Sequence, residues 1–252
     1  MLVASRLGRR AGVAAAAGVA AFTVSMSASS SQPRSLSLSM PRDETVDVLE
    51  RLYAGLPDIH EVPLQEVNQI DASGGNQTYG ELTIRGVREI AEILRPNVND
   101  VFVDMGSGAG RCILQAALEW PCRRSVGVEL SKSRHDVAAM ALARAQPSVQ
   151  RRTSLLHDDL LTCTDFEDAT IVYVASLLFD EAFMARLAER LSSLPRVRAI
   201  ATLTRLPTES LGMQFVEDPR NAARSDDPQT LRERVEVTWG AARVYLYWRR
   251  DE

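Results

Sequence analysis

The sequence predicts an α/β protein with a mostly parallel sheet that carries helices on both faces. Short apolar runs rich in β-branched residues alternate with helical patterns, and this alternation is typical of parallel strands joined by crossover helices. The expected strands cover residues 101–105, 125–130, 153–157, 171–175 and 197–204. The expected helices between them cover residues 111–120, 131–145 and 180–194. In such sheets ligands bind beyond the carboxyl ends of the strands.

Helical patterns also precede the first strand. Asp43 is placed to cap a helix that runs to Tyr53, and residues 71–76 are expected to form a loop. Thr83 is placed to cap a second helix that ends at Arg95-Pro96. We therefore expect residues 43–98 to form a helical lid region and residues 99–252 to form the domain with the sheet. Near the C-terminus, residues 234–238 and 243–248 are expected to pair as an antiparallel hairpin at one sheet edge, with residues 239–242 between them.

The overall composition is that of a globular protein and not of a nucleic-acid-binding protein. Of 252 residues, 45% are hydrophobic and 25% are charged, which excludes disorder throughout the chain. Aromatic residues make up 6% and the formal net charge is −4, so weak or no direct binding of nucleic acid is expected. The three cysteines and three histidines lack the spacing of metal ligands, and no metal site is predicted.

Residues 1–42 differ from the rest of the chain. They contain five arginines and no acid, and an Ala/Val/Gly-rich stretch leads into a Ser-rich run. This composition predicts a mitochondrial or plastid presequence. The alternatives are a secretory signal or the first half of a two-part plastid signal, and a disordered tail with no targeting function. The apolar stretch is too short for a membrane span, so no membrane partner is expected. Without residues 1–42, 24 basic residues remain against 33 acidic ones, a net charge of −9.

A glycine-rich loop after the first strand is the strongest motif. Asp104 ends the strand, and Gly106, Gly108 and Gly110 alternate into the start of a helix. Glycine is needed where the backbone turns tightly and passes close to a ligand, and the helix N-terminus offers free N–H groups. The spacing is not that of a dinucleotide fingerprint, G-x-G-x-x-G. The acid beside the loop suits an ammonium group better than a pyrophosphate. An ordinary βα turn is the alternative.

Acids follow the next two strands as well. Glu129 ends the second strand, where a carboxylate can accept both hydroxyl groups of a ribose. Asp159 and Leu160 follow the third strand, where an acid and an apolar side chain could hold an adenine ring. Together with the glycine loop, these positions predict a site for an adenosine-containing ligand.

The motifs carry a family resemblance. The run Asp104-Met-Gly-Ser-Gly-Ala-Gly110 resembles the loop of class I S-adenosylmethionine-dependent methyltransferases. With Thr78-Tyr79-Gly80-Glu81 before a helix, Leu114-Gln-Ala-Ala117 and Gly127-Val-Glu129, the chain resembles the disruptor-of-telomeric-silencing (histone H3 lysine-79, non-SET) methyltransferases from about Tyr79 to Leu246. The resemblance implies a Rossmann-like fold with a mostly parallel seven-stranded sheet, an antiparallel C-terminal hairpin and a helical N-terminal subdomain. It also implies that S-adenosyl-L-methionine contacts Tyr79, Gly80, Glu81, Leu82, Asp104, Met105, Gly106, Ser107, Gly108, Ala109, Gly110, Arg111, Glu129, Asp159 and Leu160.

The substrate side departs from that family. Where the family has two asparagines and Phe-x-Phe, this chain has Ala175-Ser176 and keeps only Phe179. Ser176 could offer an oxygen to an acceptor amine. Trp239-Gly and Tyr245 resemble the family's aromatic lysine channel, and a plain core hairpin is the alternative. We therefore expect Ser176, Phe179 and Tyr245 to act in catalysis. The basic extension by which the family grips the nucleosome is missing.

The function expected from this resemblance is transfer of a methyl group to a protein lysine. The leaving group is a neutral thioether, so alignment and a deprotonated amine matter more than an acid catalyst. The expected partner is a histone or an organellar protein with an accessible lysine. A small-molecule methyltransferase and a cofactor-binding assembly factor without turnover are the alternatives. The presequence points to a mitochondrion or plastid, with the nucleus as the alternative.

Overall fold

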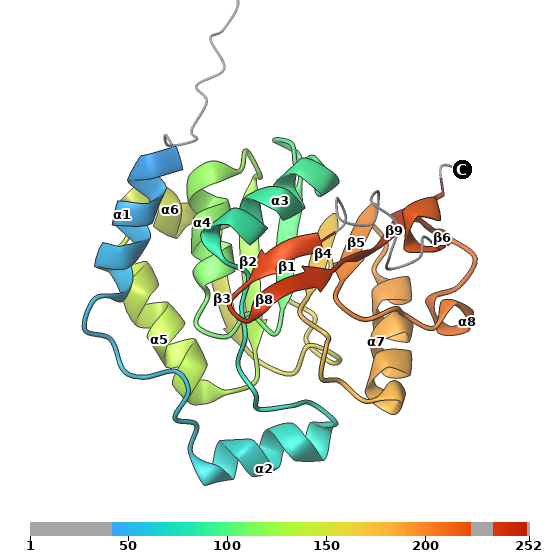
Figure 1. The fold of residues 1–252 in the computed structure, drawn as a ribbon, viewed down its shortest axis with the longest axis horizontal. Coiled ribbons are helices and arrows are strands. Elements are labelled where there is room, and N and C mark those ends of the chain that lie inside the picture. Colours follow the sequence, from blue (N-terminus) through green and yellow to red (C-terminus); the bar gives the residue numbers. More distant parts are fainter. Residues whose placement is uncertain (1–41, 223–233, 251–252) are drawn as a thin grey trace, which may run out of the picture. The chain divides into compact units, whose positions relative to one another are not determined.

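The computed structural model describes residues 42–222 and 234–250, which lie in one compact unit, residues 37–252 (Figure 1). The predicted presequence falls almost wholly outside these residues and stays a prediction. The main sheet has seven strands in the order β3-β2-β1-β4-β5-β9-β6. Their bounds are Val101–Met105 (β1), Arg124–Glu129 (β2), Thr153–His157 (β3), Ile171–Val174 (β4), Ala199–Thr202 (β5), Phe215–Glu217 (β6) and Tyr245–Arg249 (β9). Strands β1 to β5 are parallel, and β9 is antiparallel to both β5 and β6. The predicted Rossmann-like, mostly parallel seven-stranded sheet is confirmed.

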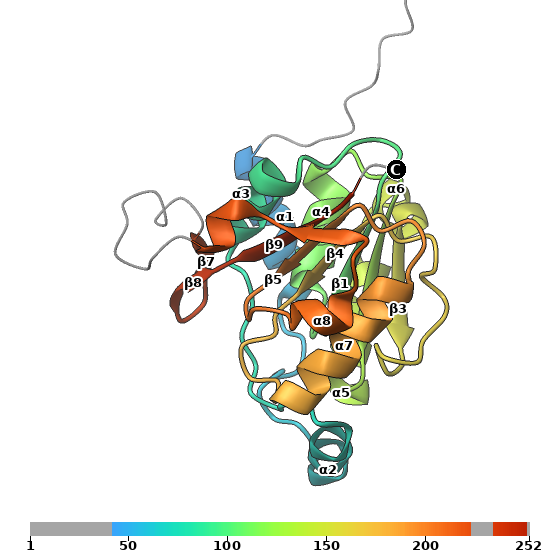
Figure 2. The same ribbon diagram turned by 90° about the vertical axis from the view of Figure 1, so that its right-hand side faces the viewer.

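The predicted C-terminal hairpin was wrong in its pairing. Strand β7 (Arg234–Val237) pairs with β8 (Gly240–Arg243), and these two strands form a separate small sheet. Thr238 and Trp239 make the turn between them, so the chain reverses earlier than expected. Strand β9 instead enters the main sheet between β5 and β6 (Figure 1), and Figure 2 shows it next to β5. The local sequence allowed both pairings, and burial of Leu246 and Tyr247 in the main sheet decides between them.

The five predicted helices are all present in the predicted order, together with three further helices and a 3₁₀ turn that the sequence did not predict. Their bounds are Arg42–Tyr53 (α1), Leu64–Ser73 (α2), Ile84–Leu94 (α3), Arg111–Glu119 (α4), Lys132–Ala143 (α5), Pro147–Arg152 (α6), Glu181–Ser193 (α7) and Thr208–Leu211 (α8), with a 3₁₀ turn at Pro219–Ala222 (η1). The Thr83 side chain accepts a hydrogen bond from the Gly86 N–H and caps α3, as predicted. Helix α1 begins at Arg42, so Asp43 lies inside it and not at its cap.

Helix α2 is one of three helices that the sequence did not reveal; the other two are α6 and α8. Its last residues, Asp71 to Ser73, were expected to belong to a loop. Within α2 only Ile70 is buried, so the segment has no apolar stripe of helical period from which it could be recognised. Gly74, with a left-handed φ of 86°, ends the helix.

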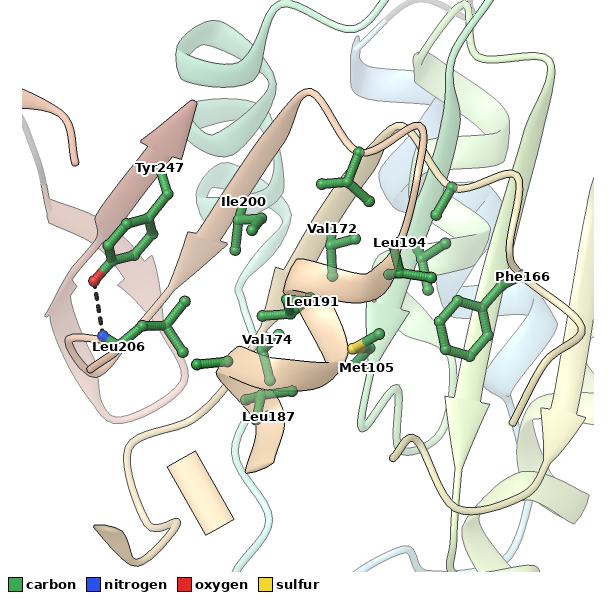
Figure 3. Packing of buried hydrophobic residues seen from close by; sticks show 14 of the residues in the cluster. Met105, Phe166, Val172, Val174, Leu187, Leu191, Leu194, Ile200, Leu206 and Tyr247 are labelled. Carbon is green, nitrogen blue, oxygen red and sulfur yellow. Dashed lines mark hydrogen bonds between the residues drawn. The ribbon is translucent and has the colours of Figure 1, made fainter. Parts of the chain in front are cut away.

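Two hydrophobic layers enclose the sheet. On one face, α7 packs its Leu187 and Leu191 against strand residues such as Val172 and Val174 (Figure 3). On the other face, α3 and α4 pack against the strands together with the β7–β8 pair. Since successive strand side chains point to opposite faces, Asp104 and Tyr173 share this second face with Phe102 and Ile171. No helix in the described part of the chain is long and apolar enough to cross a bilayer.

Candidate functional site

The loop after β1 has the backbone shape that its glycines predict. Gly106, Gly108 and Gly110 all have positive φ values of 85°, 54° and 77°, which residues with a side chain rarely adopt. A Cβ atom at Gly108 would lie 2.4 Å from the Tyr79 ring, whereas one at Gly106 would meet nothing within 4 Å. The loop is therefore covered by Tyr79 at one glycine and opens onto free space at another.

Glu129 ties this loop to the end of the neighbouring strand. Its carboxylate accepts the Gly108 N–H at 2.7 Å and the Ser131 N–H at 2.8 Å. The side chain is buried, and burial raises its pKa, although the two N–H groups act in the opposite direction. Each carboxylate oxygen keeps a second lone pair with which it can accept a hydroxyl group.

A main pocket opens at the carboxyl ends of the strands, beside this loop. Its lining includes Glu129, and Asp159 and Leu160 from the segment after β3. Of the residues predicted to bind the cofactor, it is lined by Tyr79, Gly80, Met105, Gly106, Gly108, Glu129, Asp159 and Leu160. The predicted positions after the first three strands thus come together in one pocket.

A smaller inner pocket adjoins the main pocket and is rich in acids. The other predicted cofactor residues Glu81, Leu82, Asp104 and Ser107 line it, together with Cys112, Tyr173 and Ala175. Burial raises the pKa of Asp104 to about 7, the charges of Glu129 and Glu81 act in the same direction, and a hydrogen bond from the Cys112 thiol opposes them. Among the described residues, no group donates a hydrogen bond to Asp104 Oδ1. A buried carboxylate oxygen without a donor fits a ligand that brings one.

The strip of residues 79–82 forms part of the wall of the inner pocket. The Tyr79 hydroxyl donates to the Glu81 carboxylate at 2.6 Å, and Arg111 pairs with Glu81 at 3.4 Å. The β7–β8 pair holds the strip in place, because the Thr238 N–H donates to the Glu81 carbonyl at 2.9 Å. The Trp239 ring lies directly against Gly80, where a Cβ atom would come within 1.9 Å of it. A side chain at position 80 would therefore have to displace the Trp239 ring.

An acceptor pocket, as we name it, lies next to the main pocket and carries no charge. It is lined by Asn76, Thr78, Tyr79, Gly80, Ala175, Leu177, Leu178, Phe179 and Trp239. The first five of these and Phe179 also line the main pocket, so the two spaces share a wall. Leu177, Leu178 and Trp239 remain 42%, 53% and 51% exposed, which gives the acceptor pocket an apolar rim.

Of the three predicted catalytic residues, only Phe179 lines these pockets. Ser176 is fully buried, its hydroxyl accepts the Thr204 N–H at 3.0 Å, and it reaches none of the three pockets. Ala175 takes the pocket-facing position because it continues the two-residue alternation of Tyr173. Tyr245 pairs with Thr202 in the sheet and lies under the Arg243 guanidinium, and it lines none of these pockets either. Trp239, which the family resemblance placed at the lysine channel together with Tyr245, does line the acceptor pocket.

Three predicted cofactor residues build the loop without lining a pocket for the cofactor. The Ala109 carbonyl accepts the Tyr53 hydroxyl at 2.6 Å, and Gly110 is the N-cap of α4. The Arg111 guanidinium lies 4.2 Å from the Tyr53 ring centre and beside Glu81. These three residues line neither the main nor the inner pocket, and their contacts hold the loop in place.

Helix α2 and Arg134 are the functional elements that the sequence did not reveal. Ile70 and Ser73 of α2 line the main pocket. Glu66 accepts hydrogen bonds from Ser131 and Ser133 at one end of α2, and Arg186 of α7 donates to the Ser73 carbonyl at 2.7 Å at the other end. Arg134 is buried over the Tyr79 ring, 4.9 Å from its centre. No local pattern marks these contacts.

The described residues hold no group of three or more histidine, cysteine, aspartate or glutamate side chains able to bind a metal ion.

Comparisons with known proteins point to one family. A family model described as "Histone methylation protein DOT1" matches residues 65–249. A relative from Caenorhabditis elegans, "Histone-lysine N-methyltransferase, H3 lysine-79 specific", is 26% identical over 197 residues, 73% of this chain and 20% of the relative. A relative of the same name from Eremothecium gossypii is 32% identical over 124 residues, 48% of this chain and 20% of the relative. The chain thus spans about a fifth of the length of these two curated relatives.

Solved structures include an RNA methyltransferase from Salinibacter ruber in complex with S-adenosyl-L-homocysteine. It aligns with 66% of this chain and 91% of its own, at 19% identity and a TM-score of 0.42.

Proposed function

Because this chain belongs to the DOT1 family of histone methylation proteins, we propose that it transfers a methyl group from S-adenosylmethionine to the side-chain amine of a protein lysine. The observation that carries the proposal is the wall shared by the main pocket and the uncharged acceptor pocket. Two ligands bound in these pockets would meet at Tyr79, Gly80, Ala175 and Phe179.

The residues of the main and inner pockets fit the cofactor. Asp104 Oδ1 lacks a hydrogen-bond donor and suits an ammonium group. Glu129 can accept ribose hydroxyls, and Asp159 with Leu160 can hold an adenine ring. The space beside Gly106 leaves room for the chain between the two ends of the cofactor. When bound, S-adenosylmethionine supplies a methyl group on a positively charged sulfur.

The acceptor pocket can prepare a lysine side chain for the reaction. No charged side chain lines it, so a lysine ammonium that enters leaves water without gaining a counterion. Desolvation of this kind lowers the pKa of an amine and favours the neutral form, which is the nucleophile. The Phe179 and Trp239 rings confine the aliphatic part of the side chain, and positioning then carries the reaction.

The protein that presents the lysine is proposed to be a non-histone protein. The curated relatives are named as specific for H3 lysine-79, and this chain covers about a fifth of their length. The net charge of −9 over residues 43–252 is unfavourable for a particle wrapped in DNA. The predicted presequence supports a substrate in a mitochondrion or plastid, and the nucleus is the alternative.

Methyl transfer from radiolabelled S-adenosylmethionine by the purified full chain tests the proposal. Extracts of organelles and of nuclei are the substrates, and mass spectrometry locates the labelled residue. We expect methyl-lysine in a protein of the organelle extract. Label in a small molecule would support the small-molecule alternative, and cofactor binding without any transfer would favour an assembly factor.

A further inference from the structure

The inner pocket contains two buried oxygen atoms for which the described residues supply no partner. These are Asp104 Oδ1 and the Tyr173 hydroxyl, on side chains that are 4% and 2% exposed. Buried polar groups nearly always have a hydrogen-bond partner, and leaving one without a partner costs stability. Two such atoms in the lining of one pocket indicate a ligand that satisfies both.

The sheet holds the two residues side by side. Asp104 on β1 and Tyr173 on β4 are opposite one another in the parallel register, and both point to the face covered by α3 and α4. Both also line the inner pocket. Burial raises the pKa of the Tyr173 phenol well above its ordinary value, and the negative charge of the nearby Asp104 is the second largest cause. Tyr173 therefore stays protonated and neutral, and its oxygen can accept a hydrogen bond.

The charges around the pocket decide which kind of ligand fits. Its lining contains the acids Asp104 and Glu81, and no lysine, arginine or histidine. Glu129 adds a third negative charge close by, as its effect on Asp104 shows. A carboxylate would be repelled here. An ammonium group has three N–H donors and a positive charge, so it can bond to two oxygens that face one pocket.

We infer that Tyr173 is a further cofactor-binding residue, whose hydroxyl joins the Asp104 carboxylate in binding the ammonium group at the amino-acid end of S-adenosylmethionine. The inference rests on the proposed function and adds a contact that neither the motifs nor the comparisons assign. It also explains why a tyrosine stands where the neighbouring strand residues, Val172 and Val174, are aliphatic.

Calorimetric titration of Tyr173→Phe with two ligands tests this contact. S-adenosylhomocysteine carries the amino-acid end, whereas 5′-methylthioadenosine has the same nucleoside and lacks that end. Loss of one hydrogen bond to a charged group should weaken S-adenosylhomocysteine binding by about tenfold to a hundredfold. Binding of 5′-methylthioadenosine should not change, because it has no ammonium group to lose the bond.

Tyr247→Phe is the matched control. The Tyr247 hydroxyl is buried too, but it accepts the Leu206 N–H at 2.7 Å and lines none of the three pockets (Figure 3). This variant should lower the melting temperature and leave both affinities unchanged. Tyr173→Phe should not lower the melting temperature of the free protein, since it removes a hydroxyl that has no partner there.

The outcomes separate this inference from the function on which it rests. If the unaltered chain binds neither ligand, the cofactor assignment fails and the inference fails with it. If the unaltered chain binds S-adenosylhomocysteine and Tyr173→Phe binds it equally well, only the inference is overturned. Equal weakening for both ligands would overturn it as well, because the effect would then not depend on the ammonium group.

Discussion

Ser176 and Thr204, which follow the ends of β4 and β5, are joined by two hydrogen bonds. The Thr204 N–H donates to Ser176 Oγ at 3.0 Å, and the Thr204 hydroxyl donates to the Ser176 carbonyl at 2.9 Å. Ser176 therefore ties the segments after these two strands together, while its neighbour Ala175 lines the acceptor pocket.

Ser176→Ala should destabilise the protein and leave the methyl-transfer rate nearly unchanged. The substitution leaves the partly buried Thr204 N–H without an acceptor, which should cost about 1–3 kcal/mol in the free energy of unfolding. Denaturant unfolding and kcat measured well below the melting temperature check both parts. Ser193→Ala, at an exposed position on α7, is the control and should change stability by less than about 0.5 kcal/mol. A large fall in kcat at unchanged stability would restore Ser176 as a catalytic residue.

Gly106→Arg and Glu129→Ala should each abolish or strongly weaken cofactor binding. Arginine at Gly106 would strain a φ of 85° and fill the space beside the loop. Alanine at Glu129 removes the acceptor for the Gly108 and Ser131 N–H groups and for the ribose, a loss of about 1.5–3 kcal/mol. Calorimetric titration with S-adenosylmethionine measures the effect. Glu167→Ala, whose exposed carboxylate pairs with Arg190, should bind normally. Normal affinity in both site variants would remove the cofactor assignment.

Asp104 should make both stability and cofactor affinity depend on pH. Its pKa is about 7 in the folded protein and 3.8 as an ordinary value. Between these values the folded state binds a proton that the unfolded chain has released. The contribution of Asp104 to the free energy of unfolding is therefore fully present below about pH 4 and is lost as the pH rises through about 7.

Asp104→Asn should remove this dependence. We expect the free variant to melt above the unaltered protein at pH 8, and the difference to shrink at pH 5. An ammonium ligand prefers the ionised carboxylate, so S-adenosylhomocysteine should bind the unaltered protein more tightly at pH 8 than at pH 6. The Asp104→Asn variant should bind S-adenosylhomocysteine weakly at both pH values. Asp71→Asn, at an exposed position on α2, is the control. A melting-temperature difference that does not vary with pH would contradict the assignment of the titration to Asp104.

The full chain alone should methylate nucleosomes poorly. Residues 43–252 carry a net charge of −9 and a single lysine, Lys132, so few phosphate contacts are available. Any affinity for nucleosomes should fall steeply between low and physiological salt, because it depends on counterion release. Methylation of nucleosomes and of the lysine-bearing protein found in extracts should be compared at two salt concentrations. Efficient methylation of histone H3 in nucleosomes at physiological salt would overturn the preference for a non-histone substrate.

The sequence predicted those parts of the site that depend on short-range patterns. Strand β1, its glycine loop and Glu129 follow from hydrophobic runs and from glycine spacing, and the structure brings them to one pocket. The family resemblance drawn from the same motifs is confirmed by the match over residues 65–249. Phe179 also lies where it was expected.

The remaining parts depend on contacts between distant segments. Ser176 was expected at the acceptor amine, but the alternation of side chains along β4 turns it away. Trp239 and Tyr245 were both expected at the lysine channel, but Tyr245 belongs to a strand of the main sheet, and of the two only Trp239 lines the acceptor pocket. Helix α2 is held over the main pocket by Glu66 and Arg186, which bond to partners far along the chain.

The insertion of β9 between β5 and β6 has a consequence for the order in which the protein can fold during synthesis. Until residues 245–249 leave the ribosome, the outer edge of β5 has no neighbour and β6 has no strand to pair with. Such an open edge is a site where nascent chains aggregate or recruit chaperones. Trp239, which closes over Gly80, is made just before β9. The cofactor site therefore becomes complete only when translation has passed these residues, and a ribosome that stalls before them would carry a chain unable to close its own ligand pocket.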